Sequence, residues 1–318
     1  MKKISFIIPC YNEEENVEAM YQALSALVQQ ELSAYDYDIL FIDNKSKDRT
    51  RSLLRGICQK DQKVKAIFNT ANFGQFNSPY YGMCQTDGDC TILLCCDFQD
   101  PLYLIMAFVK EWEAGAKVVC GIKTSSRESR VLYMLRSAYY KVIKKLSDVE
   151  QIEHFTGFGL YDASFVEILR DLDDPTPFLR GIVAEYAPDH VEIAYEQEKR
   201  RGGKTHNNWY TLYDAAMLSF TSYTKIGLRI ATLLGFVASG VSILIAIVYL
   251  ILKLIFWDRF AAGQAPMLIG VFLMGGIQLL FIGLLGEYLL SVHARLVHRP
   301  LVVEEQRLNF EKKTRAKE

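Results

Sequence analysis

Three oxygen-bearing side chains, those of Asp97, Gln99 and Asp100, directly follow an apolar run in the chain. An Asp-x-Gln-Asp sequence at the end of a buried strand would place carboxylate and amide oxygens on one turn. Mg²⁺ and Mn²⁺ prefer such ligands, and they bind phosphate substrates through few protein groups. Asp97 and Gln99 are therefore the candidate ligands of a divalent cation, Mg²⁺ or Mn²⁺. For Asp100 a second interpretation is equally open, as the N-cap of a helix that begins at Pro101.

The elements that must position these groups alternate between short β-rich runs and longer amphipathic ones. The β-rich runs lie at 4–8, 37–42, 64–68, 91–96 and 117–121, and they do not alternate in polarity. This pattern predicts a doubly wound α/β domain with a parallel sheet covered on both faces. Ligands bind beyond the carboxyl ends of the strands in such sheets. The segments expected to meet at that edge are "PCYNEEEN", "DNKSKDRT", "NTANFGQ", "DFQDP" and "GIKTSSR".

The remainder of the chain divides into segments of different character. We expect the α/β domain to span residues 1–207, with a further strand at "FTGFGLYD" and a basic loop at "KRRGGKTHNNW" near its end. Residues 208–229 carry an aromatic-rich stripe at helical spacing, which predicts a juxtamembrane amphipathic helix. Ordinary packing against the α/β domain is the alternative. Residues 291–318 are expected to form a cytoplasmic C-terminal tail.

Two long apolar runs lie within residues 230–290. Ile230–Leu252 contains no charged residue, and Met267–Gly286 has only Gln278 as a strongly polar one. Each run reaches the length of about 20 apolar residues that a transmembrane helix requires. Flanking basic residues favour cytoplasmic termini, which would place the α/β domain on the cytoplasmic side. A buried hairpin of soluble helices is the alternative.

The composition excludes some functions and constrains the compartment. The 318 residues carry a formal net charge of -1, so no basic field indicates nucleic-acid binding. All seven cysteines lie between Cys10 and Cys120 without metal-ligand spacing, which indicates a reduced environment. Cys95 and Cys96 are expected to be buried, structural cysteines rather than nucleophiles, because apolar neighbours raise the pKa of a thiol. The N-terminal apolar run is too short for a signal peptide.

The motifs together resemble the family-2 glycosyltransferases, and within them the polyprenyl-phosphate branch that includes dolichol-phosphate mannose synthase and bacterial undecaprenyl-phosphate glucosyltransferases. The resemblance covers nearly the whole chain. It implies a GT-A (Rossmann-like) nucleotide-sugar transferase domain followed by juxtamembrane helices and two transmembrane helices. The motifs that carry it are "IIPCYNEEEN", "DNKSKDRT", "NFGQ", "CDFQDP", "GIKTSSR", "PFLRG", "RRGGKT" and "GEYLLSVHARLVHRP".

The resemblance also implies a nucleotide site, with two departures from the family pattern. Its residues would be Pro9, Tyr11, Glu13 and Asp43, with Asp97 near the diphosphate. The first departure is Asp43-Asn44-Lys45-Ser46, where the family usually has Asp-Asp-Gly-Ser. The second is Cys95, where the family usually has a further Asp. These changes would alter donor preference and place more of the metal binding on Asp97 and Gln99.

The expected reaction is inverting transfer of a hexosyl or N-acetylhexosaminyl group from a nucleotide diphosphate sugar, taken to be UDP-linked, to polyprenyl (undecaprenyl) phosphate. The acceptor phosphate is already anionic, so cations rather than a strong base are required. An alternative for these cations is a basic stripe on anionic lipid headgroups. In the basic motif "RRGGKT" and the residue after it, His206 stands where the family has a lysine, and Lys204 is the nearest lysine that could replace it. The candidate catalytic cations are Arg127, Arg136, Arg200 and Lys204.

Three alternatives to this function stay open at the level of sequence. The chain could be a catalytically silent membrane scaffold for a lipid-sugar flippase, for which the missing acid at Cys95 would account. It could instead glycosylate another lipid acceptor or extend a polysaccharide.

Similar proteins suggest a homo-oligomer. The partners expected for the preferred function are a nucleotide sugar, polyprenyl phosphate and the lipid bilayer.

Overall fold

The computed structural model describes two compact units of the chain, each considered by itself. The described parts of the first unit are residues 1–125, 152–172, 174–198 and 300–310. Those of the second are isolated positions between 217 and 255 and the helix α10 (Gln264–Leu296). The expected cations Arg127, Arg136, Arg200 and Lys204 lie outside the described residues.

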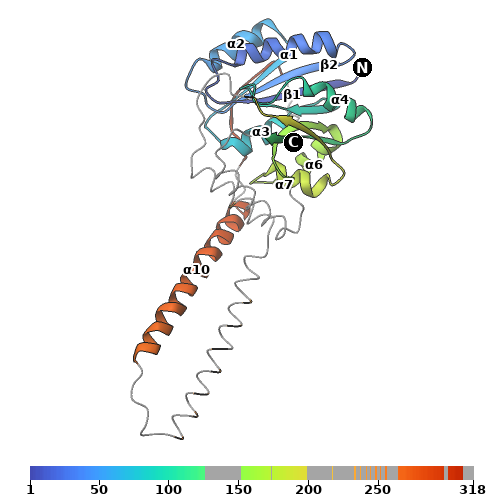
Figure 1. Ribbon diagram of the computed structural model, residues 1–318. Coiled ribbons are helices and arrows are strands. Elements are labelled where there is room, and N and C mark those ends of the chain that lie inside the picture. The colour runs from blue at the N-terminus through green and yellow to red at the C-terminus, as the bar shows by residue number, and fades with distance from the viewer. Residues whose placement is uncertain are drawn as a thin grey trace, which may run out of the picture. The chain divides into compact units, whose positions relative to one another are not determined.

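The first unit is built on one mixed sheet whose described strands follow the order β7-β5-β6-β4-β1-β2-β3-β8 (Figure 1). β1 pairs in parallel with β2 and β4, β2 with β3, and β5 with β7. β6 runs antiparallel to both β4 and β5, and β8 runs antiparallel to β3. The strands are β1 (Lys3–Cys10), β2 (Asp36–Asp43), β3 (Val64–Asn69), β4 (Cys90–Leu93), β5 (Val118–Ser125), β6 (Phe155–Asp162), β7 (Val191–Glu196) and β8 (Glu304–Leu308).

This arrangement confirms the predicted α/β class and the common edge. β4 and β5 both oppose β6, so they point the same way, and the carboxyl ends of β1 to β5 and β7 lie on one side of the sheet. The prediction of a purely parallel sheet was wrong in two places, since β6 is inserted between β4 and β5 and β8 closes the far edge. Neither insertion disturbs the edge where the polar segments gather.

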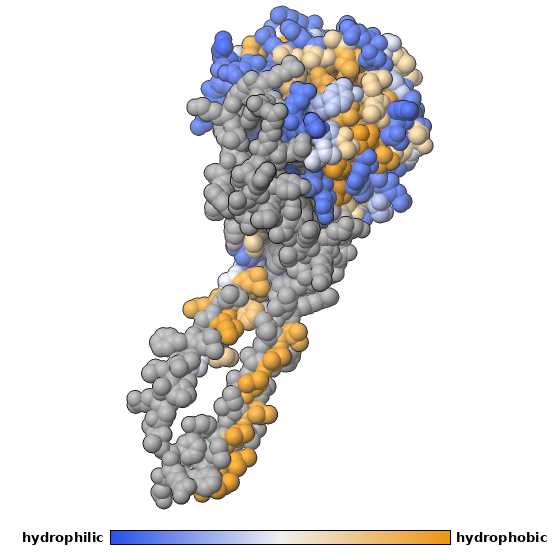
Figure 2. Space-filling view, in the orientation of Figure 1, coloured by the Kyte–Doolittle hydropathy of each residue, from blue (hydrophilic) through white to orange (hydrophobic). Residues whose placement is uncertain are grey.

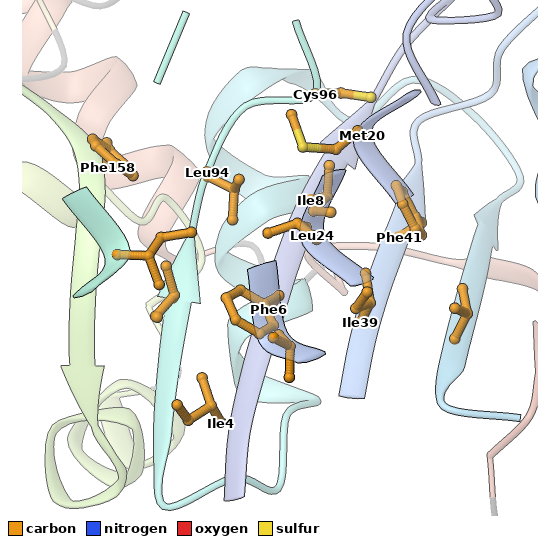
Figure 3. Close-up of a cluster of buried hydrophobic side chains, with 14 of the residues drawn as sticks. Ile4, Phe6, Ile8, Met20, Leu24, Ile39, Phe41, Leu94, Cys96 and Phe158 are labelled. Atoms are coloured by element: carbon orange, nitrogen blue, oxygen red, sulfur yellow. The ribbon is translucent and has the colours of Figure 1, made fainter. Parts of the chain in front are cut away.

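Helices cover both faces of this sheet, and the strand residues alternate between two cores. Ile4, Phe6 and Ile8 of β1 pack on one face against Met20 and Leu24 of α1, in a core to which α2 and α4 also contribute (Figure 3). Ile7, on the other face of β1, belongs to a second core with α3, α6 and α7. Each fully buried aliphatic or aromatic side chain contributes about 1.5–3 kcal/mol. The helices are α1 (Val17–Glu31), α2 (Thr50–Lys60), α3 (Gly74–Cys84), α4 (Leu104–Glu113), α6 (Ala163–Leu172) and α7 (Leu179–Tyr186).

The second unit presents apolar side chains at its surface (Figure 2). The described positions between Leu233 and Ile255 are helical, and each carries an exposed large apolar side chain. In α10, described side chains such as Met267, Leu279 and Leu289 are exposed as well. Within the part of the chain that the structure describes, no helix combines the length and the apolarity needed to cross a bilayer.

The segment that follows α10 is an integral part of the first unit. β8 pairs with β3 from Ala66↔Leu308 to Asn69↔Glu304, so residues that the sequence analysis assigned to a tail form an edge strand. Thr70 N–H also donates to Val303 O at 2.9 Å. β8 therefore closes the edge that β3 would otherwise leave open.

Candidate active site

Three loops at the carboxyl edge of the sheet hold a non-glycine residue in the left-handed region. Asn12 follows β1 with φ 55°, Lys45 follows β2 with φ 65°, and Phe98 follows β4 with φ 59°. Such a conformation is unfavourable for L residues, most of all for a bulky side chain such as Phe. Strain of this kind persists where the surrounding structure fixes it, and it is enriched at functional sites. The three loops therefore mark this edge as the candidate site.

The loop after β4 contains the two residues expected to bind a metal, Asp97 and Gln99. Asp97 is 7 % exposed, and its Oδ1 accepts a hydrogen bond from Gln99 N–H at 3.1 Å. The left-handed Phe98 between them is buried and reverses the chain. The donor set of one carboxylate and one amide oxygen suits a hard cation. Among the described residues no group of three or more His, Cys, Asp and Glu is gathered for a metal.

Asp100 closes the same loop and does not cap a helix. Its Oδ2 accepts from Cys95 N–H at 2.8 Å, and its Oδ1 accepts from the Tyr195 hydroxyl at 3.2 Å. Burial raises the pKa of Asp100 to about 6. The interpretation of Asp100 as an N-cap was wrong, because α4 begins only at Leu104 and the residue before it is Tyr103. Tyr195 belongs to β7, so the Asp100 carboxylate connects the loop after β4 to β7, a contact that the sequence analysis did not predict.

The two adjacent cysteines differ in environment. Cys96 is buried, as expected, whereas Cys95 is exposed, so the prediction of a buried side chain at position 95 was wrong. Desolvation by the surrounding protein atoms, together with the carboxylates of Asp100 and Asp97, nevertheless raises the pKa of the Cys95 thiol well above its ordinary value. A thiol held protonated in this way is a poor nucleophile.

The first loop contributes three of the expected nucleotide residues to this edge. Pro9 lies near the end of β1, and Tyr11 follows in a half-buried position. Glu13 is buried, its N–H donates to Thr50 Oγ1 at 2.8 Å, and its carboxylate accepts from Asn16 Nδ2 at 2.6 Å. Glu13 thus helps to fix the entry into α1, while Pro9 and Tyr11 border the site.

Asp43 ends β2 and is completely buried, with partners inside the protein. Both carboxylate oxygens lie within 3.3 Å of Ser46 N–H, and Arg51 Nε donates to Oδ2 at 2.7 Å. Burial raises the pKa of Asp43, although Ser46 and Arg51 act in the opposite direction. A nucleotide group that binds Asp43 would therefore share it with Arg51, a residue that the sequence analysis did not single out.

The loops after β1 and β2 are joined by reciprocal hydrogen bonds. Asn12 N–H donates to Ser46 Oγ at 2.9 Å, and Lys47 N–H donates to Asn12 Oδ1 at 2.8 Å. Glu14 accepts from both the backbone and the side chain of Arg49, each at 3.0 Å. These bonds hold the first loop against the second, which accounts for the left-handed conformation at Asn12.

Asn44, the first departure from the family pattern, connects the second loop to the third. Its Nδ2 donates to Asn72 Oδ1 at 2.8 Å and to Gly74 O at 3.0 Å, while its Oδ1 accepts from Phe73 N–H at 2.9 Å. The backbone partners fix the orientation of the amide, since Gly74 O can only accept and Phe73 N–H can only donate. An aspartate could not make the two donations, so the structure explains why an amide suits this position.

Residues 5–172 match the sequence pattern of Glycosyl transferase family 2, which is more than half of the 318 residues. The chain therefore belongs to glycosyl transferase family 2. It is a glycosyltransferase with an α/β, GT-A-like domain, and the edge described above is where its polar loops meet.

More specific similarity comes from individual proteins. The chain is 29 % identical over 299 residues to the bactoprenol glucosyl transferase of Shigella phage SfV, covering 94 % of this chain and 96 % of that protein. It is also 29 % identical to the prophage bactoprenol glucosyl transferase homolog of Escherichia coli (strain K12), covering 94 % and 97 %. The crystal structure of mannosyl-3-phosphoglycerate synthase from Rubrobacter xylanophilus matches with a TM-score of 0.47 and 15 % identity, covering 68 % of this chain and 71 % of that one. The similarity to the two bactoprenol proteins thus extends well beyond the residues that match the family.

Proposed function

We propose that the protein is an inverting glycosyltransferase that moves a sugar from a UDP-linked donor to polyprenyl phosphate at the cytoplasmic face of a membrane. The observation that carries the proposal is the buried Asp97–Gln99 turn, which lies at the same sheet edge as Tyr11 and Asp43. The acceptor is supported by the names of the two relatives, both bactoprenol glucosyl transferases that align with nearly the whole chain.

The donor half of the site has groups for each part of a nucleotide sugar. Tyr11 offers an aromatic face to the base, and Asp43 can accept from a uracil N–H or a ribose hydroxyl. Asp97 and Gln99 would hold Mg²⁺ or Mn²⁺, which when bound neutralises charge on the departing diphosphate. Asp100 keeps that turn in shape by holding the N–H of Cys95, the residue at which the turn begins.

The acceptor half requires cations. One bond forms between a phosphate oxygen of the acceptor and the anomeric carbon, and the bond from that carbon to the diphosphate breaks, so the configuration inverts. Two anions must be brought together for this step, which is a positioning and electrostatic task. We assign it to Arg127, Arg136, Arg200 and Lys204, because arginine forks and lysine ammonium groups bind phosphate well.

The membrane part of the proposal rests on apolar surface. In the sequence, each of the runs Ile230–Leu252 and Met267–Gly286 reaches the length of about 20 apolar residues that a span requires. Their described large apolar side chains are exposed, for example Leu244 at 64 % and Leu279 at 70 %. Lipid is the occupant that would cover such surface without a polar penalty. Residues 208–229 would lie in the headgroup layer. We also propose that the protein forms a homo-oligomer, which light scattering in detergent would measure.

One experiment tests donor, acceptor and metal together. The purified full-length protein is incubated with undecaprenyl phosphate, Mn²⁺ and a panel of UDP- and GDP-sugars, and the glycolipid is identified by mass. We expect a product with a UDP-sugar and a loss of about 10² to 10³-fold in the Asp97→Asn variant. Asp36→Asn is the matched control, because Asp36 lies at the opposite end of β2, where its Oδ1 accepts from Tyr37 N–H at 2.9 Å and pairs with the half-exposed Lys63 at 2.9 Å. No product with any donor would refute the function, and full activity of Asp97→Asn with metal chelated would refute the metal site.

A further inference from the structure

β8 brings one acidic side chain from the C-terminal part of the chain to the loop after β2. Glu305 Oε2 lies 2.8 Å from Lys45 Nζ and 3.2 Å from Arg51 Nη1. These partners precede Glu305 by 260 and 254 positions in the chain. The contact therefore exists only because β8 returns to the sheet.

Arg51 connects Glu305 to the proposed nucleotide site. Its Nε donates to Asp43 Oδ2 at 2.7 Å, and its Nη2 donates to Asn69 O at 3.0 Å. The Arg51 side chain is only 14 % exposed. A guanidinium is a planar fork with donors in fixed directions, so its orientation depends on all of its acceptors. Of the three acceptors, Glu305 is the one supplied by the segment after α10.

β8 is held firmly enough to fix that carboxylate. Beyond its pairing with β3, Asn309 Nδ2 donates to the carbonyls of Cys58, Asp61 and Val64 at 2.7, 3.2 and 2.8 Å. Tyr81 donates to Glu304 at 3.0 Å, which ties the start of the strand to α3. Glu305 therefore sits in a strand that is held at both ends.

We propose that Glu305 is a positioning residue of the nucleotide site, acting on Asp43 through Arg51 and on the left-handed Lys45 directly. With Glu305 in place, Arg51 donates to Oδ2 of Asp43 in a fixed direction, so that Oδ1, which accepts from Ser46 N–H at 3.3 Å, keeps its second lone pair for the nucleotide. Without it, Arg51 loses one of three acceptors and Lys45 loses its partner, so both cations can turn toward Asp43. This inference rests on the proposed function, because Asp43 is assigned to the nucleotide there.

The matched control is on the same strand. Gln306 Oε1 accepts from Arg55 Nε at 3.3 Å and from Arg55 Nη2 at 3.1 Å, so it also joins β8 to α2, one turn beyond Arg51. Gln306→Ala removes a polar contact between the same two elements without touching the link to Asp43. Glu305→Ala removes the positioning contact, and Glu305→Gln keeps an acceptor of the same length.

The test is isothermal titration calorimetry of the full-length protein with UDP in the presence of Mn²⁺. Melting temperatures are recorded for every variant. We expect Glu305→Ala to bind UDP about fivefold more weakly, because Arg51 and Lys45 then lose a partly exposed ion-pair partner. In the transfer assay KM for the donor should rise with kcat unchanged. Gln306→Ala should bind like the wild type, and Glu305→Gln should fall between.

The outcomes separate this inference from the function on which it rests. If the wild type binds UDP and Glu305→Ala binds it equally well, the inference is overturned and the function stands. Equal weakening by Gln306→Ala would overturn it too, since the effect would then belong to strand docking. Should Glu305→Ala fail to fold, unchanged UDP affinity in Glu305→Gln would overturn the inference in its place. Absence of UDP binding by the wild type would refute the proposed function and the inference together.

Discussion

Replacing Asn44 by aspartate would restore the residue that the family usually carries, yet we expect it to damage this protein. Asn44 is 7 % exposed and makes two donations that a carboxylate cannot make, to Asn72 Oδ1 and to Gly74 O. The change leaves size and shape almost unaltered. Its effect therefore isolates the exchange of a donor for a charged acceptor.

The size of the effect follows from these contacts. Each lost hydrogen bond costs about 1 kcal/mol net, and a buried acceptor that faces another acceptor adds a comparable penalty. The Asn44→Asp variant should therefore lose about 2–4 kcal/mol of stability. For a unit of this size the melting temperature should fall by about 5 to 15 °C. Because a protonated carboxyl can donate once, the loss should shrink toward pH 5.

Thermal unfolding of the full-length protein, followed by circular dichroism at pH 5 and pH 7.5, measures this effect. Asn12→Asp is the matched control, since it makes the same chemical change in the neighbouring loop. The side chain of Asn12 acts as an acceptor there, for Lys47 N–H at 2.8 Å, and a carboxylate keeps that bond. The control should melt within about 2 °C of the wild type. Equal melting temperatures for Asn44→Asp and the wild type at pH 7.5 would refute the reasoning.

Three further substitutions test separate contacts. Tyr195→Phe removes the hydroxyl that donates to Asp100, and we expect the Mn²⁺ concentration for half-maximal transfer to rise about fivefold. Asp162→Asn should cost about 1–2 kcal/mol at pH 7, because hydrogen bonds from its neighbours outweigh burial and hold the pKa of Asp162 at about 2. That advantage of the wild type is complete above about pH 4 and is lost as the pH falls through about 2, which melting curves across that range would follow. Asn309→Ala removes an amide whose two N–H donors are shared among three backbone carbonyls, and it should lower the melting temperature by about 5–10 °C.

Each of these expectations has an outcome that contradicts it. An unchanged Mn²⁺ requirement in Tyr195→Phe would show that the contact from β7 to Asp100 does not affect metal binding at Asp97 and Gln99. A pH-independent difference between wild type and Asp162→Asn would show that packing rather than charge is responsible. A melting temperature like the wild type's in Asn309→Ala would show that β8 docks without its terminal contact.

The sequence by itself determined the features that depend on local pattern. The strands β1 to β5, the buried face of α1 and the Asp97–Gln99 turn were predicted from apolar periodicity and from the polar residues that end a buried strand. Periodicity is a property of neighbouring residues, and burial of one strand face follows from it directly. The common edge was predictable for the same reason, because parallel strands place their carboxyl ends together.

Only the tertiary structure decided which groups meet across that edge. Asp100 pairs with Tyr195 of β7, and Arg51 lies between Asp43 and Glu305, because β6 is inserted next to β4 and β8 is added next to β3. Strand order places residues far apart in the chain in contact, and no local pattern encodes it. Hydrogen bonds depend on distances of about 3 Å and on direction. Partners separated by 95 to 260 positions are therefore fixed by the packing of the whole sheet.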